Sequence, residues 1–517
     1  MTQATDPFKL PAGYTVHEVS DEPARSGKPS AAKKLIELAR AGYRFARSSE
    51  GGALFAIPRE GPNIAADLDD GSFDDDLAAA YFASTGDAAS GEAITSAMRV
   101  IKSEARQADA EPIPIRVAAI GDEPGAVIDL GDETGRAIRV TGGGWDVLDR
   151  SPTPFRRTPL TGAMPTPERG GDIDTLREFI NLAPEQLDIV VGWMLACWRP
   201  ATPCPILLLS GGQGTGKSSA TRLLARLVDP TTCEDRQPPR DNEQLIMAAQ
   251  SSRVVLLDNV SAISNDLSDS LCRLCTGGGF LKRKLYTNGG VTAASFRRAA
   301  ILNSIEVTAI RGDFAERMLV ADLAQIPAGQ RRIEEELTRK FASAHPKILG
   351  ALLDRFADAL AVIDAVELEE MPRMADFARF LAAMDETAGT STLATYGGQE
   401  LRVAEDVLES SAITPYLLAV VDRAGTVRGT AGQILAAITP AGNTPKELKV
   451  TPRKLSGDLR RLKPALETAG YEVCLPTGDG PTQRIFEVRR PGHPGPDDEY
   501  RVVSRDELAG MPDAGAG

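Results

Sequence analysis

The run Gly-Gly-Gln-Gly-Thr-Gly-Lys-Ser at residues 211–218 carries the clearest chemistry in the chain. It fits the pattern G-x-x-x-x-G-K-[ST], whose glycines let successive backbone N–H groups wrap around a phosphate. An apolar run precedes it and a helical pattern follows it, which is the context that phosphate binding requires. We expect Lys217 to reach the β- and γ-phosphates of ATP and Ser218 to ligate Mg²⁺. The residues predicted to bind the nucleotide are Gly211, Gly212, Gln213, Gly214, Thr215, Gly216, Lys217, Ser218 and Ser219.

An acidic residue, Asp258, lies where a metal site next to the phosphate loop would need one. The apolar run Val254–Leu257 ends in Asp258, forty residues after Ser218, and this gap fits a helix, a strand and another helix. Asp258 is predicted to hold Mg²⁺ beside Ser218, although an Asp can also simply end a core strand. Asn259 follows where many ATPases place a Glu that orients the attacking water. Either the base lies elsewhere, with Asp266 and Asp269 nearby in sequence, or turnover is slow.

The segment 280–304 predicts a basic hairpin followed by a buried strand. Asn288-Gly289 favours a tight turn between two strands, on which Lys282, Lys284 and Tyr286 share one face. Such a face suits phosphate contact and base stacking on single-stranded nucleic acid, and an exposed hairpin with solubilising charges is the alternative. The residues of this hairpin predicted to contact DNA are Lys282, Arg283, Lys284 and Tyr286.

Two further polar residues lie at the ends of apolar runs. Asn303 ends the run 299–302, so we expect it to face the γ-phosphate and to sense it. Arg317 precedes a final apolar strand and is a candidate arginine finger for the ATP of a neighbouring subunit. A surface salt bridge is the alternative for Arg317. The predicted catalytic set is therefore Lys217, Asp258, Asn303 and Arg317.

The ordered series of phosphate loop, strand-end acid, basic hairpin, strand-end Asn and Arg resembles the superfamily 3 helicases. It is most similar to the helicase part of poxvirus-type primase-helicases and to ATP-binding proteins of phages and integrated elements. The likeness covers about residues 110–490 and is carried by VVLLDNVS (254–261), LCRLCTGGGFLKRKLYT (271–287), RGDFAERML (311–319) and PRMADFARF (372–380).

This resemblance implies an α/β fold with a P-loop AAA+-type parallel sheet that binds ATP and Mg²⁺. It further implies a homo-hexameric ring in which Arg317 acts in trans and Lys282 and Lys284 grip DNA in the central pore. Asn259 departs from the family pattern, and this puts efficient unwinding in doubt.

A basic module is predicted near the C-terminus. Residues 427–490 contain 11 Lys and Arg against 6 Asp and Glu, in a chain whose net charge is −14. Helices at 430–437 and from about 452, followed by strands at 471–475 and 484–488, give the outline of a winged helix. Its predicted DNA contacts are Arg453, Lys454, Arg460 and Arg461, and a protein-binding winged helix is the alternative.

The remaining segments are divided by composition and periodicity. We expect disorder at 1–30, a mixed α+β domain at 31–150, a Pro-rich linker at 151–171, the ATPase core at 172–330, a helical region at 331–426, the winged helix at 427–490 and a disordered tail at 491–517. Within the N-terminal domain, helices are predicted at 31–46 and 91–108, and strands at 53–57, 113–119, 126–130 and 137–140. The region from 385 to 426 has a less regular pattern.

Composition excludes several classes of protein. A net charge of −14 rules out a basic surface over the whole protein. Six irregularly spaced Cys and three scattered His favour neither a disulfide framework nor a His-rich metal site, and Cys272 and Cys275 are expected to be buried thiols. The acidic run at 67–76 is expected to be a solvated loop. The longest apolar stretch, Ile189–Trp198, is too short to cross a bilayer, so we expect no membrane contact and a cytoplasmic location.

These features together predict a ring-forming, ATP-driven DNA motor, a replicative helicase of a phage or mobile element. Its expected partners are single-stranded and duplex DNA and a separate primase or polymerase. Two alternatives stay open: an origin-binding or regulatory protein with ATP as a switch, and a nucleotide-gated signalling ATPase.

Overall fold

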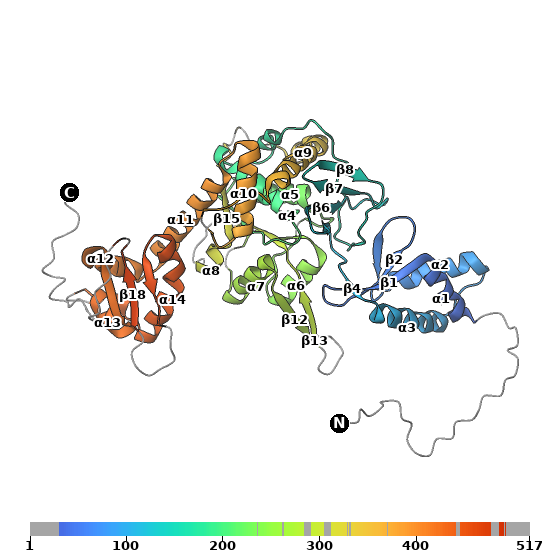
Figure 1. Ribbon diagram of the computed structural model, residues 1–517, viewed down its shortest axis with the longest axis horizontal. Helices are drawn as coiled ribbons and strands as arrows, with labels where there is room; N and C mark the ends of the chain where they lie inside the picture. The colour runs from blue at the N-terminus through green and yellow to red at the C-terminus, as the bar shows by residue number, and fades with distance from the viewer. Residues whose placement is uncertain are drawn as a thin grey trace, which may run out of the picture.

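The computed structural model of the chain describes residues 30–234, 236–260, 263–283, 291–303, 312–327, 329, 332–369, 371–440, 445–476, 485–490 and 492. The predicted disorder at 1–30 and 491–517 falls outside these residues, apart from Ser30 and Gly492. Three bodies follow one another across Figure 1, with the N-terminal unit and the C-terminal unit on opposite sides of a central body.

The N-terminal unit is a five-stranded sheet of order β4-β1-β2-β3-β9, covered by three helices. Its elements are α1 (Ala31–Gly42), β1 (Tyr43–Ser48), β2 (Leu54–Pro58), β3 (Ile64–Asp67), α2 (Ser72–Thr85), α3 (Gly91–Gln107), β4 (Ala110–Glu111) and β9 (Phe155–Arg156). The strand predicted at 53–57 and the helix predicted at 91–108 are confirmed.

Two predictions in this unit are wrong. The helix expected to reach residue 46 ends at Gly42, because the residues that follow pair with β2. The acidic run 67–76 is not wholly a loop: α2 begins at Ser72 and buries Phe73 and Leu77. Asp74 and Asp75 occupy the first turn of this helix, where negative charge is favourable to the helix dipole.

A second, antiparallel sheet of order β5-β6-β7-β8 follows. Its strands are β5 (Val117–Ile120), β6 (Glu123–Asp129), β7 (Ala137–Thr141) and β8 (Gly144–Leu148). Its buried residues, such as Ile128 and Ile138, share one hydrophobic cluster with the helices of the central body. Residues 31–150 therefore contain two sheets, and the second packs as part of the central body.

The central body is built on a four-stranded sheet of order β11-β14-β10-β15, in which every pairing is parallel. Its strands are β10 (Ile206–Ser210), β11 (Val254–Leu257), β14 (Ala299–Asn303) and β15 (Met318–Asp322). The helices around it are α4 (Leu187–Cys197), α5 (Lys217–Val228), α6 (Asn242–Ser251), α7 (Asn265–Thr276) and the short α8 (Gly312–Ala315). Strands β12 (Gly279–Arg283) and β13 (Val291–Ser295) pair antiparallel and extend from it, as predicted, whereas the turn predicted at Asn288-Gly289 lies outside the described residues.

The alternation of side chains along β10 divides the core into two layers. Leu207 and Leu209 face the cluster that contains α4, α5 and α9 (Glu334–Val362), whereas Ile206 and Leu208 face the cluster under α6 and α7. The uninterrupted apolar run of β10 is thus explained by burial on both faces.

Two expectations for the central body fail. The strand predicted between Ser218 and Asp258 does not form in the described residues, where only α5 and α6 separate them. The helices predicted at 172–198 are confirmed only in their second part, as α4, and the first part forms two short 3₁₀ turns, Ile173–Glu178 and Pro184–Gln186.

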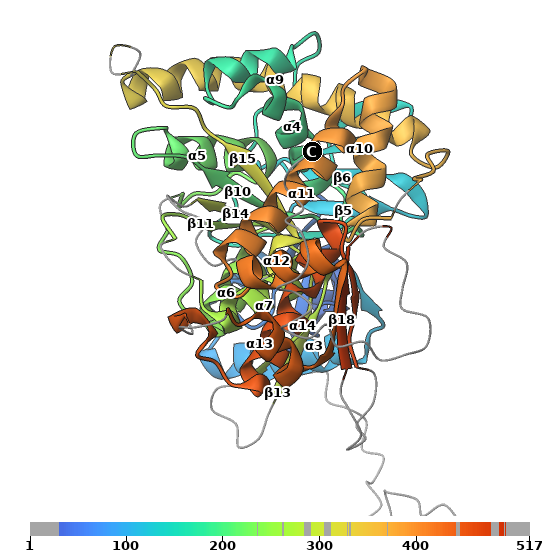
Figure 2. The same ribbon diagram turned by 90° about the vertical axis from the view of Figure 1, so that its left-hand side faces the viewer.

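Beyond β15 the chain is helical and then forms a small antiparallel sheet of order β16-β18-β17. The elements are α9, α10 (Ala375–Ala388), α11 (Thr392–Ser410), α12 (Thr414–Ala424), β16 (Thr426–Thr430), α13 (Ala431–Ile438), a 3₁₀ turn (Lys446–Leu448), α14 (Pro452–Thr468), β17 (Glu472–Cys474) and β18 (Ile485–Arg489). The less regular region 385–426 is therefore mostly α11 and α12, and β16 was not predicted. Figures 1 and 2 both show α11 running from the central body to the C-terminal unit.

The expectation of buried thiols at positions 272 and 275 is confirmed. Cys272 and Cys275 are buried, and burial raises the pKa of the Cys275 thiol to about 12. Among the described residues no group of three His, Cys, Asp or Glu side chains could hold a metal ion. No helix in the described part of the chain has the length and apolar character needed to cross a membrane.

Candidate nucleotide site and DNA-contacting residues

The candidate nucleotide site lies at the carboxyl edge of the parallel sheet. Leu209 of β10 is in register with Asn303 of β14, and Leu257 of β11 is in register with Leu302. The loop after β10, the Asp258 that follows β11 and the Asn303 that ends β14 therefore meet at one edge. In open α/β sheets this edge is where ligands bind.

The loop 211–218 has the backbone of a phosphate cradle. Gly211, Gly214 and Gly216 have φ values of 151°, 83° and 82°, a region that residues with a Cβ rarely adopt. A Cβ on Gly211 would lie 2.9 Å from the Leu323 carbonyl oxygen, so this position also needs glycine for space. Thr215 is buried, and its hydroxyl donates to the Gly212 carbonyl at 3.0 Å, which closes the loop.

Lys217 and Ser218 open helix α5 and point into this loop and toward β11. The Lys217 ammonium donates to the carbonyls of Gly211 and Gly212 at 2.6 and 2.8 Å, and partial burial lowers its pKa. The Ser218 hydroxyl donates to Asp258 Oδ1 at 3.0 Å. The predicted metal ligands, forty residues apart in sequence, are thus in direct contact.

The side chain of Asn303 makes more hydrogen bonds inside the protein than the sequence suggested. It is 2 % exposed, and its Nδ2 donates to Asp258 Oδ1 and, at 3.0 Å, to the Thr221 hydroxyl. Its Oδ1 accepts from the backbone N–H of Asn259 at 2.6 Å. Both protons and the oxygen of the amide are therefore used inside the protein. In this arrangement Asn303 positions Asp258, and a role in sensing phosphate would require it to exchange one of these bonds.

Asn259, which replaces the expected acid, has an unusual backbone. Its φ is 54°, in the left-handed region where Asn is the best tolerated residue after Gly. Its side chain is exposed, as are those of Asp266 and Asp269 on α7.

Arg317 lies between α8 and β15, and it is 7 % exposed in the single chain. Burial raises the pKa of Cys275 on α7, and the positive charge of Arg317 partly offsets that effect. An arginine that reaches the nucleotide of another subunit must lie at the surface, so Arg317 would have to leave this position. Its action in trans stays a prediction.

Three residues of the site were missed. Thr221 accepts a hydrogen bond from Asn303. Gln186 makes two hydrogen bonds with Asp322: its Nε2 donates to Asp322 Oδ2 at 3.3 Å, and its Oε1 accepts from the Asp322 backbone N–H at 2.5 Å. Asp322 ends β15 in register with Ser210, so the rule that identified Asp258 and Asn303 could have found it. Nothing in the sequence around Gln186 signals its contact.

The structure describes some of the residues predicted to contact DNA. Lys282 and Arg283 lie on β12, and Lys284 and Tyr286 fall outside the described residues. The four predicted DNA contacts of the C-terminal unit, Arg453, Lys454, Arg460 and Arg461, all lie on α14.

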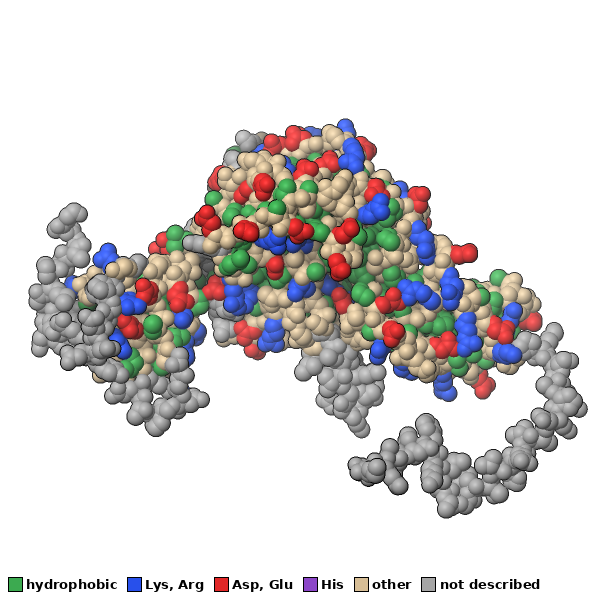
Figure 3. Space-filling model, viewed as in Figure 1, with side chains coloured by type: hydrophobic (Ala, Val, Ile, Leu, Met, Phe, Trp, Pro, Cys, Tyr) green, Lys and Arg blue, Asp and Glu red, His purple; other side chains and the backbone are tan. Residues whose placement is uncertain are grey.

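On α14 the four basic residues have different surroundings. Arg453 and Lys454 are exposed in the first turn, which begins with Pro452 and a Thr451 cap. Arg461 pairs with Asp458, and the Arg460 guanidinium lies 5.7 Å from the centroid of the Phe486 ring. On the face shown in Figure 3, Lys and Arg side chains are interspersed with Asp and Glu over all three bodies.

Two family comparisons bear on this arrangement. Residues 173–406 match the family described as actinomycete integrative conjugative element replication protein. Residues 413–501 match the C-terminal domain of the same replication proteins. The central body and the C-terminal unit are therefore similar to a replication protein of a conjugative element.

Solved structures give a weaker likeness. An apo structure of the NrS-1 C-terminal region is 12% identical, with 89% of this chain and 99% of that chain covered and a TM-score of 0.39. The structure titled "SCCmec type IV Cch - active helicase" is 11% identical, with 86% and 93% covered and a TM-score of 0.40. The JCV helicase is 14% identical over 45% of this chain and 64% of that chain, with a TM-score of 0.23. No curated protein matches the chain significantly.

Proposed function

We propose that this protein is an ATP-driven DNA motor, the replicative helicase of an integrative conjugative element. The observation that carries the proposal is the contact between Ser218 and Asp258 beside a glycine loop, at the carboxyl edge of a parallel sheet. The match of residues 173–406 to replication proteins of conjugative elements supports the DNA-related part.

The residues at this edge fit MgATP. The positive-φ glycines leave backbone N–H groups free to face phosphates, and Lys217 supplies a positive charge within the loop. Ser218 and Asp258 would hold Mg²⁺, which neutralises charge on the β- and γ-phosphates when bound. Asn303 keeps the Asp258 carboxylate in place through its amide protons. Thr215 keeps the loop closed.

The test is steady-state ATP hydrolysis with and without single-stranded DNA. We expect DNA to stimulate hydrolysis, and Lys217→Ala to abolish it because the only ammonium in the loop is removed. Lys340→Ala is the matched control, because Lys340 is an exposed helix residue paired with Glu336. Hydrolysis that is indifferent to DNA would reject the motor.

Assembly into a closed ring, with a hexamer as the expected form, is part of the proposal. A finger in trans makes sense only at a head-to-tail interface, where Arg317 of one subunit meets Lys217 of the next. Mixing Lys217→Ala with Arg317→Ala subunits should then restore hydrolysis at about a quarter of the interfaces. A monomeric, fully active enzyme, or a mixture no more active than its components, would refute the ring mechanism.

A second candidate function, origin binding with ATP as a switch, is favoured by the C-terminal unit. We infer a winged helix there, and the order of helix α12, strand β16, helices α13 and α14, and strands β17 and β18 supports this inference. Arg453 and Lys454 at the exposed start of α14 are better placed for duplex phosphates than Arg461, which is paired.

This candidate predicts which basic pair matters for duplex DNA. Arg453→Ala with Lys454→Ala should lower duplex affinity and reduce the salt slope by about 0.9 per lost phosphate contact. Arg461→Ala should change it less. If this double variant binds duplex DNA like the parent protein while hydrolysis on single strands is intact, the C-terminal unit is not the duplex contact.

A further inference from the structure

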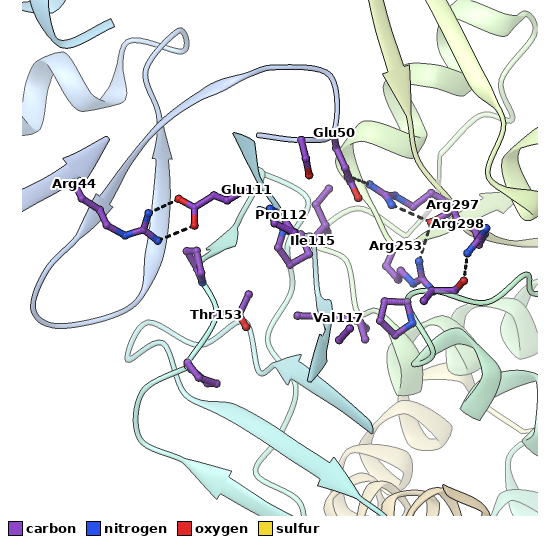
Figure 4. A pocket seen from close by; sticks show the side chains of 18 residues that line it. Arg44, Glu50, Glu111, Pro112, Ile115, Val117, Thr153, Arg253, Arg297 and Arg298 are labelled. Atoms are coloured by element: carbon purple, nitrogen blue, oxygen red, sulfur yellow. Dashed lines mark hydrogen bonds and ion pairs between the residues drawn. The ribbon is translucent and has the colours of Figure 1, made fainter. Parts of the chain in front are cut away.

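A cavity lies at the amino edge of the parallel sheet, opposite the edge that carries the phosphate loop. Its volume is about 620 Å³, and it is bounded by the N-terminal unit, by β5 and by the loops that enter the parallel strands. Arg253 immediately precedes β11, and Arg297 and Arg298 immediately precede β14. Because these strands are parallel, their amino ends lie at the edge away from the phosphate loop, so the two sites are separate. Figure 4 shows the three arginines at this cavity.

Two of the arginines that line this cavity, Arg253 and Arg297, lack a matching carboxylate among the described residues. Arg253 is 3 % exposed, and its guanidinium donates to the carbonyls of Cys197, Arg199 and Arg297 at 3.0, 3.2 and 2.8 Å. Arg297 donates to the Thr276 carbonyl at 3.2 Å. Among the described residues, no carboxylate lies within ion-pair distance of Arg253 or Arg297.

One carboxylate, that of Glu50, forms ion pairs with two neighbouring arginines. It extends from the turn after β1 of the N-terminal unit and pairs with Arg298 at 3.2 Å and with Arg156 at 3.7 Å. Figure 4 shows Glu50 directed at this cluster from the other wall. A second carboxylate in the lining, that of Glu111, is held in a bidentate pair by Arg44 on the same wall.

The cluster is therefore an unbalanced group of positive charges. Burial and the adjacent Arg298 lower the pKa of Arg253, and the same two causes lower the pKa of Arg156 to about 10. A buried guanidinium that has only carbonyl partners has its hydrogen bonds satisfied but its charge uncompensated. An anion that enters the cavity would supply the missing charge.

The remaining walls are apolar, with prolines 112, 114, 152, 154 and 200 and side chains such as Ile115 and Val117. Apolar walls around a few converging polar groups, within a volume of this size, are typical of a site for a small organic ligand. We propose that the cavity binds the phosphate of a nucleotide, with Arg253, Arg297 and Arg298 as donors and Glu50 as a competing anion. The phosphate can belong to a free nucleotide or to the 5′ end of a DNA strand.

The test uses the full chain carrying Lys217→Ala, so that hydrolysis at the loop does not interfere and the outcome does not depend on the proposed function. The probes are AMP and a fluorescent single-stranded oligonucleotide with or without a 5′-phosphate, with binding followed by calorimetry and anisotropy. Glu50→Gln removes the competing carboxylate and should tighten binding up to about fivefold, since such partly exposed pairs are worth up to about 1 kcal/mol. Arg297→Met should weaken binding by at least about tenfold, because it removes a charge-assisted donor.

Two controls separate binding from folding. Arg297→Lys keeps the charge and should retain most of the affinity, whereas Arg139→Met removes an exposed arginine of β7 outside this cavity and should change nothing. Equal affinity for AMP and the phosphorylated strand supports a free nucleotide, and a preference for the phosphorylated strand supports a strand end. The proposal is overturned if neither probe binds, if Glu50→Gln gives no gain, or if Arg297→Met binds like the parent protein.

Discussion

The replacement Asn303→Asp tests whether Asn303 positions Asp258 as its contacts indicate. The wild-type amide donates to the Asp258 carboxylate and to the Thr221 hydroxyl, and it accepts from the Asn259 N–H. A carboxyl at 303 can still accept from Asn259, and the Thr221 hydroxyl can rotate to donate to it. Only the contact with Asp258 changes from attraction to repulsion, in a position that is 2 % exposed.

The size of the effect depends on pH. Two carboxylates at roughly 4 Å repel by about 4 kcal/mol at an effective dielectric constant near 20. Protonating the introduced carboxyl removes the repulsion but costs about 1.4 kcal/mol for each pH unit above its ordinary pKa of about 3.9. At pH 5.5 protonation is the smaller cost, about 2 kcal/mol, whereas at pH 8 it would exceed 5 kcal/mol and the repulsion prevails. The folded state thus raises the pKa of the introduced carboxyl, and stability is lost as the pH rises.

The assay is thermal unfolding followed by tryptophan fluorescence at both pH values. For a body of this size about 1 kcal/mol corresponds to roughly 2–4 °C, so the deficit of Asn303→Asp should grow by about 4–8 °C between pH 5.5 and pH 8. Asn303→Leu is the control, because it removes the same donors without adding a charge and its deficit should not follow this trend. A deficit for Asn303→Asp that is equal at the two pH values would refute the assignment.

Two further predictions concern buried charge. His345 is 9 % exposed, and burial lowers its pKa to about 4, so stability should be lost as the pH falls from about 6.5 to 4, by up to about 3 kcal/mol. His345→Phe should remove this acid dependence in urea unfolding, and an unchanged pH profile would contradict it. Arg116 is buried with a φ of 60° and donates to Asp229 at 2.8 Å, so Arg116→Met should cost about 3–5 kcal/mol by leaving Asp229 unpaired. Adding Asp229→Asn should recover part of that loss in the same unfolding measurement, whereas simple addition of the two losses would show that the pairing is not the cause.

Local signals predicted the elements that place the phosphate loop. The apolar runs of β10, β11 and β14 were readable because strands buried on both faces are continuous stretches of Val, Leu and Ile. Given parallel strands, their carboxyl ends must meet, and this is why Asp258 could be expected near Ser218 without any contact information. The hydrogen bonds of Asn303 depend on strand order, which periodicity does not reveal.

The elements that sequence reasoning missed are those defined by distant partners. The two-residue strand β9, Phe155–Arg156, has no periodicity, and it joins the N-terminal sheet only through β3. Strand β16 exists because it pairs with β18, some sixty residues later. Arg317 was expected to reach the ATP of a neighbouring subunit, with a surface salt bridge as the alternative, whereas it is 7 % exposed in the single chain.

The C-terminal unit is joined to the central body by shared apolar packing. Val407 and Leu408 of α11 and Ala315 of α8 lie in one hydrophobic cluster with Leu455 and Leu459 of α14. The gap between residues 406 and 413, where the two family matches meet, therefore crosses a continuous core. Cutting the chain there would expose apolar residues on both parts, so the two parts are not independent domains joined by a linker. Helix α14 also packs against α8, which lies just before β15, and β15 pairs with the strand that leads into the phosphate loop.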